Sequence, residues 1–521
     1  MHREENSKQT VYDIFNEKKT SKSIANNPEK IKKVHYKGKL TAQERMQLLF
    51  DGGKYEETNP WIRNSCIHFD LYKKDAENEG VITGFGDVLG RKICAFSNDA
   101  FVMGASLGEA QGEKICKTID LAIKTGIPLV GLNDASGARI QEGVAGLHGY
   151  CSVFGRTSIA SGWVPQISVI LGICAGGTAY SSALTDFIIM VKSLSQMFIT
   201  GPAVIKSVTG ENVSFEELGG YKVHGSMTGL AHFIANSEEE AIQITKKLLS
   251  FLPSNSREMP PVYANTDPIE RHMPEILDII PENQNKGFDM KEIIRKTVDY
   301  QDFFEVQENF ALNMIVGFAR INGKTVGIVA NQPKVLAGCI DINASWKAAR
   351  FVRFCDSFNI PLITFADCPG YLPGVSQEHN GIIRNGSKLL FAYSEATVPK
   401  ITVVVRKDYG GAYSAMCGKG MGADIVLAFP TAEIAVMGAE GAANILFKKE
   451  IDNAENSEEK RKELIKKYKD DFLNPYRGAE YGIVDDIIDP RELREKLAKY
   501  LNILSEKEIW SPYKKHSNIP L

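Results

Sequence analysis

The sequence lacks the features that mark membrane-spanning, secreted and nucleic-acid-binding proteins. Its 521 residues contain no run of about 18 uninterrupted apolar residues, the length that spans a bilayer. Residues 1–17 mix acidic residues with lysine and have no apolar segment, unlike a signal or transit peptide. The formal net charge of −3 gives no sign of the basic surface that nucleic acids require. We therefore expect a cytoplasmic protein with no nucleic-acid partner.

The nine cysteines form no CxxC pair. Several lie within apolar runs, among them Cys94, Cys174 and Cys355. This pattern favours reduced, buried thiols over disulfides or a zinc site. We expect no metal in this chain.

The two halves of the sequence repeat one another at a nearly constant offset. Residues 84–92 match residues 317–324 at an offset of 233, and each segment is typical of a hairpin with a glycine-containing turn. Asn98 and Asn331 follow at the same offset. Repetition of this kind predicts a duplicated structural unit.

Each half continues with a helix and a strand separated by proline. Both predicted helices end before Ile-Pro-Leu, because proline removes an N–H donor and disfavours helical geometry in the residue before it. The apolar runs 129–132 and 362–365 then predict strands buried on both faces. The predicted buried faces of the two helices consist of Ile115, Ile119 and Ala122, and of Ala348, Phe351, Val352 and Cys355.

A second helix–proline–strand unit follows Pro165 and Pro399, at an offset of 234, and each strand runs into a glycine pair. These landmarks predict two duplicated α/β domains. Six prolines between residues 253 and 281 indicate a linker. The expected organisation is a lead-in at 1–35, an N-terminal domain at 36–270 and a C-terminal domain at 271–521.

Two charged segments are expected to be solvated. The lysine-rich segment 18–39 is interpreted as a solvated lead-in, with an anion-binding arm as the alternative. The charged run 448–471 is interpreted as an exposed helical insertion. Residues 418–422 are glycine-rich but lack the GxxxxGK[ST] spacing, so a structural turn is expected there.

The glycine pairs Gly176-Gly177 and Gly410-Gly411 are the strongest chemical signal. Glycine has no Cβ to block the approach of a ligand to its backbone N–H. Two successive N–H groups can hold an oxyanion, although such a pair can also serve tight packing alone. Because the two glycine pairs occupy matching places in the repeat, a functional role for both pairs is favoured.

Several separated motifs resemble those of biotin-dependent acyl-CoA carboxyltransferases. In the first half they occupy 133–142 (NDASGARIQE) and 174–181 (CAGGTAYS). In the second half they occupy 369–374 (PGYLPG), 406–413 (RKDYGGAY) and 431–438 (TAEIAVMG). The resemblance runs from about residue 35 to the C-terminus. It is strongest to propionyl-CoA carboxylase β subunits and methylmalonyl-CoA decarboxylase α subunits, and residues 514–521 particularly resemble the latter.

The resemblance implies a crotonase-type (ClpP-like) fold in each half and a homo-hexamer assembled as a trimer of dimers. It also implies active sites between the N-domain of one subunit and the C-domain of its partner. By the same resemblance, the amides of Gly176 and Gly177 stabilise the thioester enolate of the acyl-CoA. Those of Gly411 and Ala412 stabilise the ureido oxyanion of biotin. The implied substrate-binding residues are Ala138, Arg139, Tyr413 and Ser414.

The chain has neither an Ala-Met-Lys-Met biotin-acceptor sequence nor a glycine-rich segment for ATP-driven biotin carboxylation. Biotin is therefore expected on a separate carrier protein, with a biotin carboxylase or a membrane decarboxylase complex as a further partner. The direction of transfer stays open, with a slight preference for carboxylation. The small polar Ser414 predicts a short-chain acyl-CoA, of the propionyl-CoA or methylmalonyl-CoA type.

Several residues depart from the family pattern, which leaves acyl preference and rate open. They are Ala135, Trp163, Ile173, Ser182 and Asn385. Three other functions are weighed. A Ser-His-Asp hydrolase would draw on His148 or His379 but lacks a G-x-S-x-G elbow. A hydratase could use Glu142 as its carboxylate but needs one oxyanion hole, not two. A non-catalytic scaffold is the third.

Overall fold

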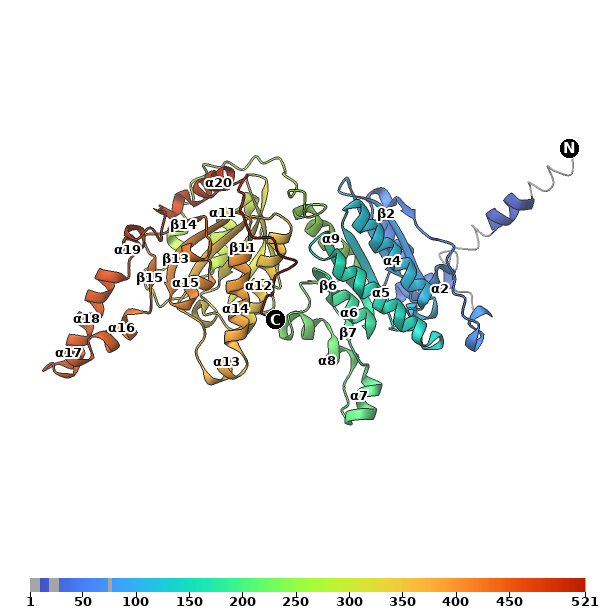
Figure 1. Cartoon of the computed structure of the whole chain (residues 1–521), viewed down its shortest axis with the longest axis horizontal. Coiled ribbons are helices and arrows are strands. Elements are labelled where there is room, and N and C mark those ends of the chain that lie inside the picture. The colour runs from blue at the N-terminus through green and yellow to red at the C-terminus, as the bar shows by residue number, and fades with distance from the viewer. Residues whose placement is uncertain (1–9, 18–27, 74–76, 521) are drawn as a thin grey trace. The chain divides into compact units, whose positions relative to one another are not determined.

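The computed structural model of the chain describes residues 10–17, 28–73 and 77–520. Within these ranges the chain forms two compact units, one ending at Ser250 and the other beginning at Phe251. Each unit is an α/β body built on its own eight-stranded sheet (Figure 1). Part of the expected lead-in, residues 1–9 and 18–27, lies outside the described residues.

The first unit alternates strands and helices after a short helical entry. Its strands are β1 (Tyr55–Glu57), β2 (Val81–Val88), β3 (Arg91–Asn98), β4 (Leu129–Ala135), β5 (Gln166–Ala175), β6 (Phe187–Val191), β7 (Gln196–Phe198) and β8 (Phe233–Ala235). Its helices are α2 (Pro28–Tyr36), α3 (Ala42–Leu49), α4 (Glu109–Thr125), α5 (Val144–Ala160), α6 (Gly177–Ala183), α7 (Pro202–Thr209), α8 (Phe215–Gly219) and α9 (Glu238–Phe251).

The second unit repeats this series with additional helices. Its strands are β9 (Phe304–Val306), β10 (Met314–Ile321), β11 (Lys324–Asn331), β12 (Leu362–Cys368), β13 (Lys400–Tyr409), β14 (Ile425–Ala428), β15 (Glu433–Ala435) and β16 (Asp486–Ile487). Its helices are α10 (Ile276–Ile279), α11 (Met290–Thr297), α12 (Ile342–Ser357), α13 (Val375–His379), α14 (Ile382–Glu395), α15 (Gly411–Ala415), α16 (Ala439–Leu446), α17 (Lys448–Asp452), α18 (Ser457–Phe472), α19 (Pro475–Glu480) and α20 (Leu493–Ile503).

The two sheets have the same topology, which confirms the predicted duplication. The first runs β1-β2-β3-β4-β5-β6-β8 with β7 beside β5, and the second runs β9-β10-β11-β12-β13-β14-β16 with β15 beside β13. Each begins with an antiparallel hairpin, β2–β3 or β10–β11, as the sequence predicts. The pairings from β3 to β6 and from β11 to β14 are parallel.

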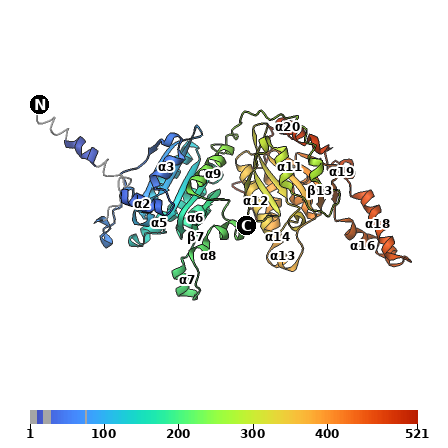
Figure 2. The same ribbon diagram turned by 180° about the vertical axis from the view of Figure 1, so that it is seen from behind.

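Matching helices cover matching faces of the two sheets. The helices α4 and α5 lie side by side in the first unit, and α12 and α14 do so in the second. The predicted apolar residues of α4 and α12 are all buried. In the second unit, α11 and α20 also contribute to the main hydrophobic core. Seen from behind, α2 and α3 are visible at the entry of the first unit (Figure 2).

A buried lysine recurs at the offset of 233. The Nζ atom of Lys114 on α4 donates to the Val81 carbonyl at 2.6 Å, where β2 begins. The Nζ atom of Lys347 on α12 donates to the Met314 carbonyl at 2.7 Å, where β10 begins. Burial lowers the pKa of Lys347 to about 7. Each lysine ties the first long helix of its unit to the first long strand.

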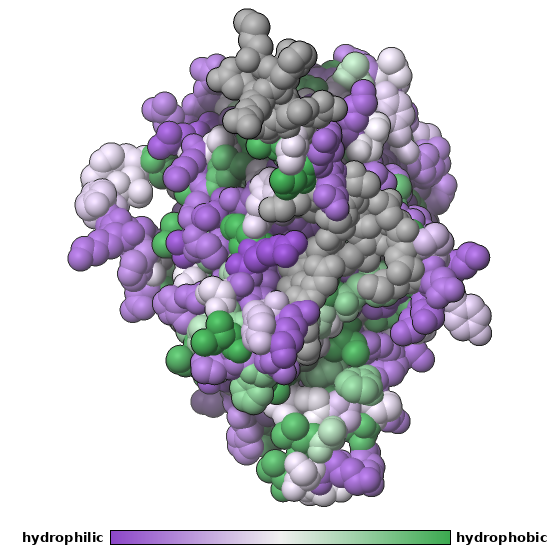
Figure 3. Space-filling model, turned by 90° about the vertical axis from the view of Figure 1, so that its right-hand side faces the viewer, coloured by the Kyte–Doolittle hydropathy of each residue, from purple (hydrophilic) through white to green (hydrophobic). Residues whose placement is uncertain are grey.

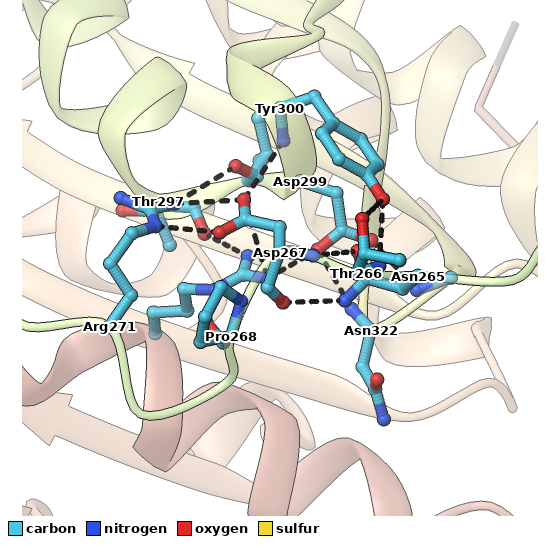
Figure 4. Close-up of polar contacts among 12 residues, drawn as sticks. Asn265, Thr266, Asp267, Pro268, Arg271, Thr297, Asp299, Tyr300 and Asn322 are labelled. Atoms are coloured by element: carbon cyan, nitrogen blue, oxygen red, sulfur yellow. Dashed lines mark hydrogen bonds and ion pairs between the residues drawn. The ribbon is translucent and has the colours of Figure 1, made fainter.

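The segment before α10 packs on the second unit. Phe251 stacks on Phe304 and Phe318, with ring centroids 5.8 Å apart in both pairs. The fully buried Arg494 lies 2.7 Å from Asp299 and donates to the carbonyl of Pro268 at 3.0 Å. Figure 4 shows Asp267 and Asp299 at the centre of these polar contacts.

Two further predictions, the exposed charged insertion and the buried thiols, are confirmed in the described part of the chain. The charged run 448–471 forms α17 and most of α18, and within these two helices only Leu464 is buried. All nine cysteines are described and are free thiols, and Cys94, Cys174 and Cys355 are buried. Among the described helices, none has the length and apolar character needed to span a bilayer. No cluster of metal-binding side chains is found among the described residues.

Candidate active site

The two glycine pairs form two turns of the same shape. Gly176 has φ 56° and ψ −119°, and Gly410 has φ 57° and ψ −128°. Residues with a Cβ rarely adopt a positive φ, so glycine is required at the first position of each turn. Gly176 follows β5 and precedes α6, while Gly410 follows β13 and precedes α15. The repeat therefore extends to the backbone geometry of the candidate site.

The first amide of each turn already has a backbone acceptor. The N–H of Gly176 donates to the Phe198 carbonyl at 3.0 Å, and that of Gly410 donates to the Ala435 carbonyl at 2.9 Å. These acceptors lie on β7 and β15, which pair with the ends of β5 and β13. Gly176 was expected to donate to an oxyanion, but in this structure its N–H is used within the sheet.

The next amides are open. Gly177 opens α6, and Gly411 and Ala412 open α15. The first N–H groups of a helix have no acceptor within that helix. No other acceptor for these three amides is found in the part of the chain that the structure describes. The available donors are therefore Gly177 in the first unit, and Gly411 and Ala412 in the second.

A tyrosine ring packs against the second glycine of each turn. A Cβ on Gly177 would lie 2.5 Å from the ring of Tyr150, so no side chain fits there. The Tyr150 hydroxyl is 2.6 Å from Oγ1 of Thr178, and burial raises its pKa. A Cβ on Gly411 would lie 3.4 Å from the ring of Tyr371, whose pKa burial raises to about 12. No sequence motif includes Tyr150, which lies on the buried face of α5.

The loop after β4 holds the expected substrate-binding residues Ala138 and Arg139. Ala138 is exposed and pairs with Leu107 through an isolated bridge. The Arg139 guanidinium is buried, with Nη1 2.7 Å from Glu79 and 2.6 Å from Glu142. Arg139 therefore shapes the loop and does not present a free cation to a substrate.

The same contacts bear on the hydratase alternative. Glu142 accepts a hydrogen bond from the Glu109 amide at 2.7 Å as well as its ion pair with Arg139. A carboxylate that is engaged on both oxygens is poorly placed to act as a base. His148 and His379, named for the hydrolase alternative, are both exposed and belong to different units.

Tyr413 and Ser414 lie on α15 directly after the second turn, and both are partly exposed. The Tyr413 hydroxyl accepts a hydrogen bond from the Lys419 amide at 3.1 Å. A Cβ on Gly418 would lie 2.5 Å from the Tyr413 ring. The ring is thus held against residues 418–419, whereas no comparable contact of the Ser414 side chain is found among the described residues.

Two buried carboxyl groups lie below the second turn. Asp367 is paired with Arg406 at 2.9 Å. Asp408 is fully buried, and neither of its side-chain oxygens has a partner among the described residues. Burial, with a smaller contribution from Asp367, raises the pKa of Asp408 well above its usual range. Asp408 belongs to the motif 406–413, but no role was predicted for it because it lies inside a strand.

The structure gives the positions and contacts of the residues that depart from the family pattern. Trp163 donates from Nε1 to the Ile123 carbonyl at 2.8 Å, and Asn385 donates to the Gly381 carbonyl at 3.0 Å. Ser182 is buried on α6, and its hydroxyl has no partner among the described residues. Ala135 and Cys174 are register partners at the ends of β4 and β5, and the exposed Ile173 precedes Cys174.

Comparison with known proteins points to one family. The model of the carboxyl transferase domain matches residues 33–519. Methylmalonyl-CoA decarboxylase subunit alpha of Propionigenium modestum is 51% identical over 504 residues, covering 97% of this chain and 98% of the relative. Propionyl-CoA carboxylase beta chain of Saccharopolyspora erythraea is 52% identical over 503 residues, covering 94% and 92%.

A solved structure agrees with these relatives. Transcarboxylase 12S, determined with methylmalonyl-coenzyme A and methylmalonic acid bound, has a TM-score of 0.93 and 50% sequence identity to this chain. The match covers 95% of this chain and 94% of that one. It confirms the predicted pair of crotonase-like α/β domains.

Proposed function

The chain belongs to the carboxyl transferase family, and from this premise we propose how its two glycine turns divide the reaction. It is a carboxyltransferase of the type found in propionyl-CoA carboxylase β chains and methylmalonyl-CoA decarboxylase α subunits. The transfer runs between carboxybiotin on a separate carrier protein and the α-carbon of a short-chain acyl-CoA. The observation that carries this proposal is the pair of matched turns with open amides.

The first turn serves the acyl-CoA. The Gly177 amide donates to the thioester oxygen as the α-carbon loses its proton and negative charge moves onto that oxygen. Gly176 sets the turn and leaves its own amide in the sheet. Pre-set donors of this kind are often a large catalytic contribution, about 3–4 kcal/mol for one donor.

The second turn serves biotin. Gly411 is exposed, whereas Ala412 is fully buried, so a flat ring reaches the turn over Gly411, which has no Cβ to block it. Bound there, carboxybiotin would supply the carboxyl group, and its ureido group would then accept the proton that the α-carbon loses. The amides of Gly411 and Ala412 donate to the ureido oxygen as negative charge develops on it.

The physiological direction has two candidates. The carboxylase direction needs a biotin carboxylase as partner, and the decarboxylase direction needs a membrane decarboxylase complex. Relatives of both kinds are about half identical to this chain. We favour carboxylation slightly, in the cytoplasm, with decarboxylation of methylmalonyl-CoA as the alternative.

We also propose a homo-hexamer, the assembly named for transcarboxylase 12S. Large apolar side chains are exposed in each unit, and such surfaces are usually covered by a partner. Examples are Ile140 and Val144 in the first unit, and Val375, Ile383 and Val436 in the second. Figure 3 shows one face of the molecule on which apolar residues interrupt the polar surface.

Replacing Ala412 by proline tests the second turn, because proline deletes the N–H donor. We expect Ala412→Pro to reduce carboxyl transfer between free biotin and methylmalonyl-CoA by about a hundredfold or more. Ala412→Gly keeps the amide and is the matched control, expected to retain most activity. Circular dichroism and gel filtration check that both variants fold and assemble alike. Full activity of Ala412→Pro would refute the role of this amide.

A further inference from the structure

The short strand β7 is held by hydrogen bonds on both of its edges. The Phe198 carbonyl accepts the hydrogen bond from the Gly176 amide at 3.0 Å, on the side of β5. In a pleated strand successive carbonyls point to opposite edges, so the Met197 carbonyl faces away from β5. Met197 is buried, and a buried carbonyl needs a hydrogen-bond donor. The donor is His224, whose Nε2 atom lies 2.8 Å from the Met197 oxygen.

The imidazole ring of His224 has a hydrogen-bond partner on each nitrogen. Its Nδ1 atom lies 3.0 Å from Oγ1 of Thr228. A carbonyl can only accept, so Nε2 carries the proton toward Met197 and Nδ1 accepts from the Thr228 hydroxyl. The Thr228 oxygen accepts in turn from the Leu230 amide at 3.3 Å. Burial lowers the pKa of His224, so at neutral pH the ring is a neutral donor whose orientation is fixed from both sides.

The backbone around His224 brings its ring close to β7. His224 lies in a π-helical turn, η7 (Val223–Met227), which follows α8 along the chain. Turns of this kind are rare and often occur at functional sites. A Cβ on Gly219, the last residue of α8, would lie 1.8 Å from the Met197 oxygen. Glycine is therefore required for the close approach of α8 to β7, which lie side by side in both views (Figures 1 and 2).

The second turn has a different anchor on its outer strand. There β15 takes the place of β7, and Ile434 is the residue that matches Met197. No side-chain donor to the Ile434 carbonyl is found in the part of the chain that the structure describes. The strand β15 is instead held through the Glu433 carboxylate, which accepts a hydrogen bond from the Tyr409 hydroxyl. The contact made by His224 is thus specific to the first turn, and the second turn is an internal reference for it.

We propose that His224 is a positioning residue for carboxyl transfer, which aligns the first turn with the thioester oxygen. The proposal rests on the proposed function, in which the Gly177 amide donates to that oxygen. His224 fixes β7 from its outer edge, and β7 holds the Gly176 amide. The peptide group between Gly176 and Gly177 thereby keeps its direction. A displacement of about 1 Å at a reacting centre can cost about a hundredfold in rate. Because the enolate charge develops only during the reaction, the loss of His224 acts on kcat.

Three variants of the full chain test the proposal. H224A deletes the donor. The amide nitrogen of H224Q occupies the place of Nε2 and keeps the donor, whereas the shorter amide of H224N ends near the place of Nδ1 and does not reach Met197. In carboxyl transfer between free biotin and methylmalonyl-CoA, H224A and H224N are expected to lower kcat by about tenfold or more, with KM for both substrates within about twofold of the parent. H224Q is expected to retain most of the parent's kcat.

Hydrogen exchange is a second measurement on the same proteins. H224A and H224N are expected to speed exchange in the peptide that contains the Gly176 amide and to leave the peptide that contains the Gly410 amide unchanged. H232A is the matched control, because Nδ1 of His232 accepts from the Ile188 amide of β6 at 3.1 Å and this histidine does not hold β7. H232A is expected to keep the parent's kcat even where it lowers stability.

Each outcome bears on the role of His224. If the parent transfers no carboxyl group to or from methylmalonyl-CoA, the proposed function fails, and the role of His224 fails with it. If the parent is active and both H224A and H224N keep its kcat, His224 does not position the turn. A loss in H224Q as large as in H224A would also overturn the proposal, because the loss would then not depend on the Nε2–H donor. A raised KM at unchanged kcat would assign His224 to substrate binding instead.

Discussion

Cys174 and Asp408 occupy the same place in the two repeats, two residues before the first glycine of each turn. Each is the register partner of the last residue of the preceding strand, Ala135 or Cys368. Cys174 packs in an apolar cluster, which suits a thiol. Asp408 brings a carboxyl group with no partner among the described residues into the matching buried place. The second repeat is therefore destabilised at this residue.

Replacing Asp408 by cysteine should stabilise the protein. Burial raises the pKa of Asp408, so between its ordinary pKa and its folded pKa the folded state binds more protons than the unfolded state. The stability of the parent therefore falls as pH rises through this window. We expect Asp408→Cys to increase the free energy of unfolding by about 1–3 kcal/mol near neutral pH, and by less in mild acid. Urea denaturation at two pH values measures both effects.

The reciprocal change, Cys174→Asp, is the control, and it should destabilise the first repeat, more so at higher pH. Asp408→Cys that is no more stable than the parent near neutral pH would contradict the argument.

At the residue scale, the sequence predicted where the turns lie but not which amides are open. The repeat located Gly176 and Gly410 because glycine is needed for the positive φ. The acceptor of the Gly176 amide, Phe198, lies on a three-residue strand that leaves no periodic pattern in the sequence. No role was predicted for the tyrosine rings behind the turns, although Tyr371 lies in the motif 369–374, because a buried tyrosine also occurs in an ordinary core.

At the scale of elements, the C-terminal tail is held to the second unit by two groups of polar contacts. Lys507 is paired with Asp424 at 2.7 Å. Glu395, at the end of α14, is paired with Lys514 at 2.5 Å and with Arg353 at 2.6 Å, and it accepts a hydrogen bond from Ser517. Although burial opposes it, the hydrogen bonds with Lys514, Ser517 and Arg353 lower the pKa of Glu395 to about 2.

Glu395→Gln should loosen the tail. The folded-state pKa of Glu395 is depressed, so its contribution is fully present above the ordinary value of 4.5 and is lost as pH falls through about 2. At neutral pH we expect faster hydrogen exchange and faster proteolysis across residues 505–517 in the variant, and little change in the global unfolding temperature. Glu480→Gln, which removes an exposed ion pair with Arg477, is the matched control. Equal cleavage of the tail in all three proteins would contradict this anchoring role.

The main helices and strands were predictable because their sequence patterns are long or because proline lies close to their ends. The helices α4 and α12 end before Pro128 and Pro361, as the sequence predicts, although α4 is capped by Gly126 in the left-handed conformation. Helical periodicity predicted their buried faces. The short strands β7 and β15 were not predicted, since three residues are too few to show alternation. They matter for the site, because they supply the acceptors that hold Gly176 and Gly410.

At the scale of the whole molecule, composition predicts a linker but not the contacts by which that segment is held. The prolines between residues 253 and 281 indicated a surface segment. The contacts of Phe251 and Asp267, which fix this segment on the second unit, depend on partners far along the chain: Phe318 and Arg494. Composition carries no information about such distant partners.

Two fragments of the second unit test where it begins. The fragment 251–521 keeps the stacked ring of Phe251 and all three carbonyls that bind Arg494, whereas the fragment 271–521 loses the ring and the carbonyls of Asp267 and Pro268 and keeps only that of Thr297. Burying a phenylalanine ring is worth about 1.5–3 kcal/mol, and each lost hydrogen bond to a charged group about 1.5–3 kcal/mol. We therefore expect the longer fragment to be more stable in urea by at least about 3 kcal/mol.

A second experiment uses the full chain, so its result does not depend on whether the fragments aggregate. Arg494→Met should lower the stability of the second unit by about 3–5 kcal/mol, because Asp299 loses the cation that faces it in a buried site. Arg491→Met, which breaks an exposed ion pair with Asp489, should have little effect. Equal midpoints for the two fragments, together with a neutral Arg494→Met, would move the start of the second unit back toward residue 270. The predicted differences would instead establish that residues 251–268 fold as part of this unit.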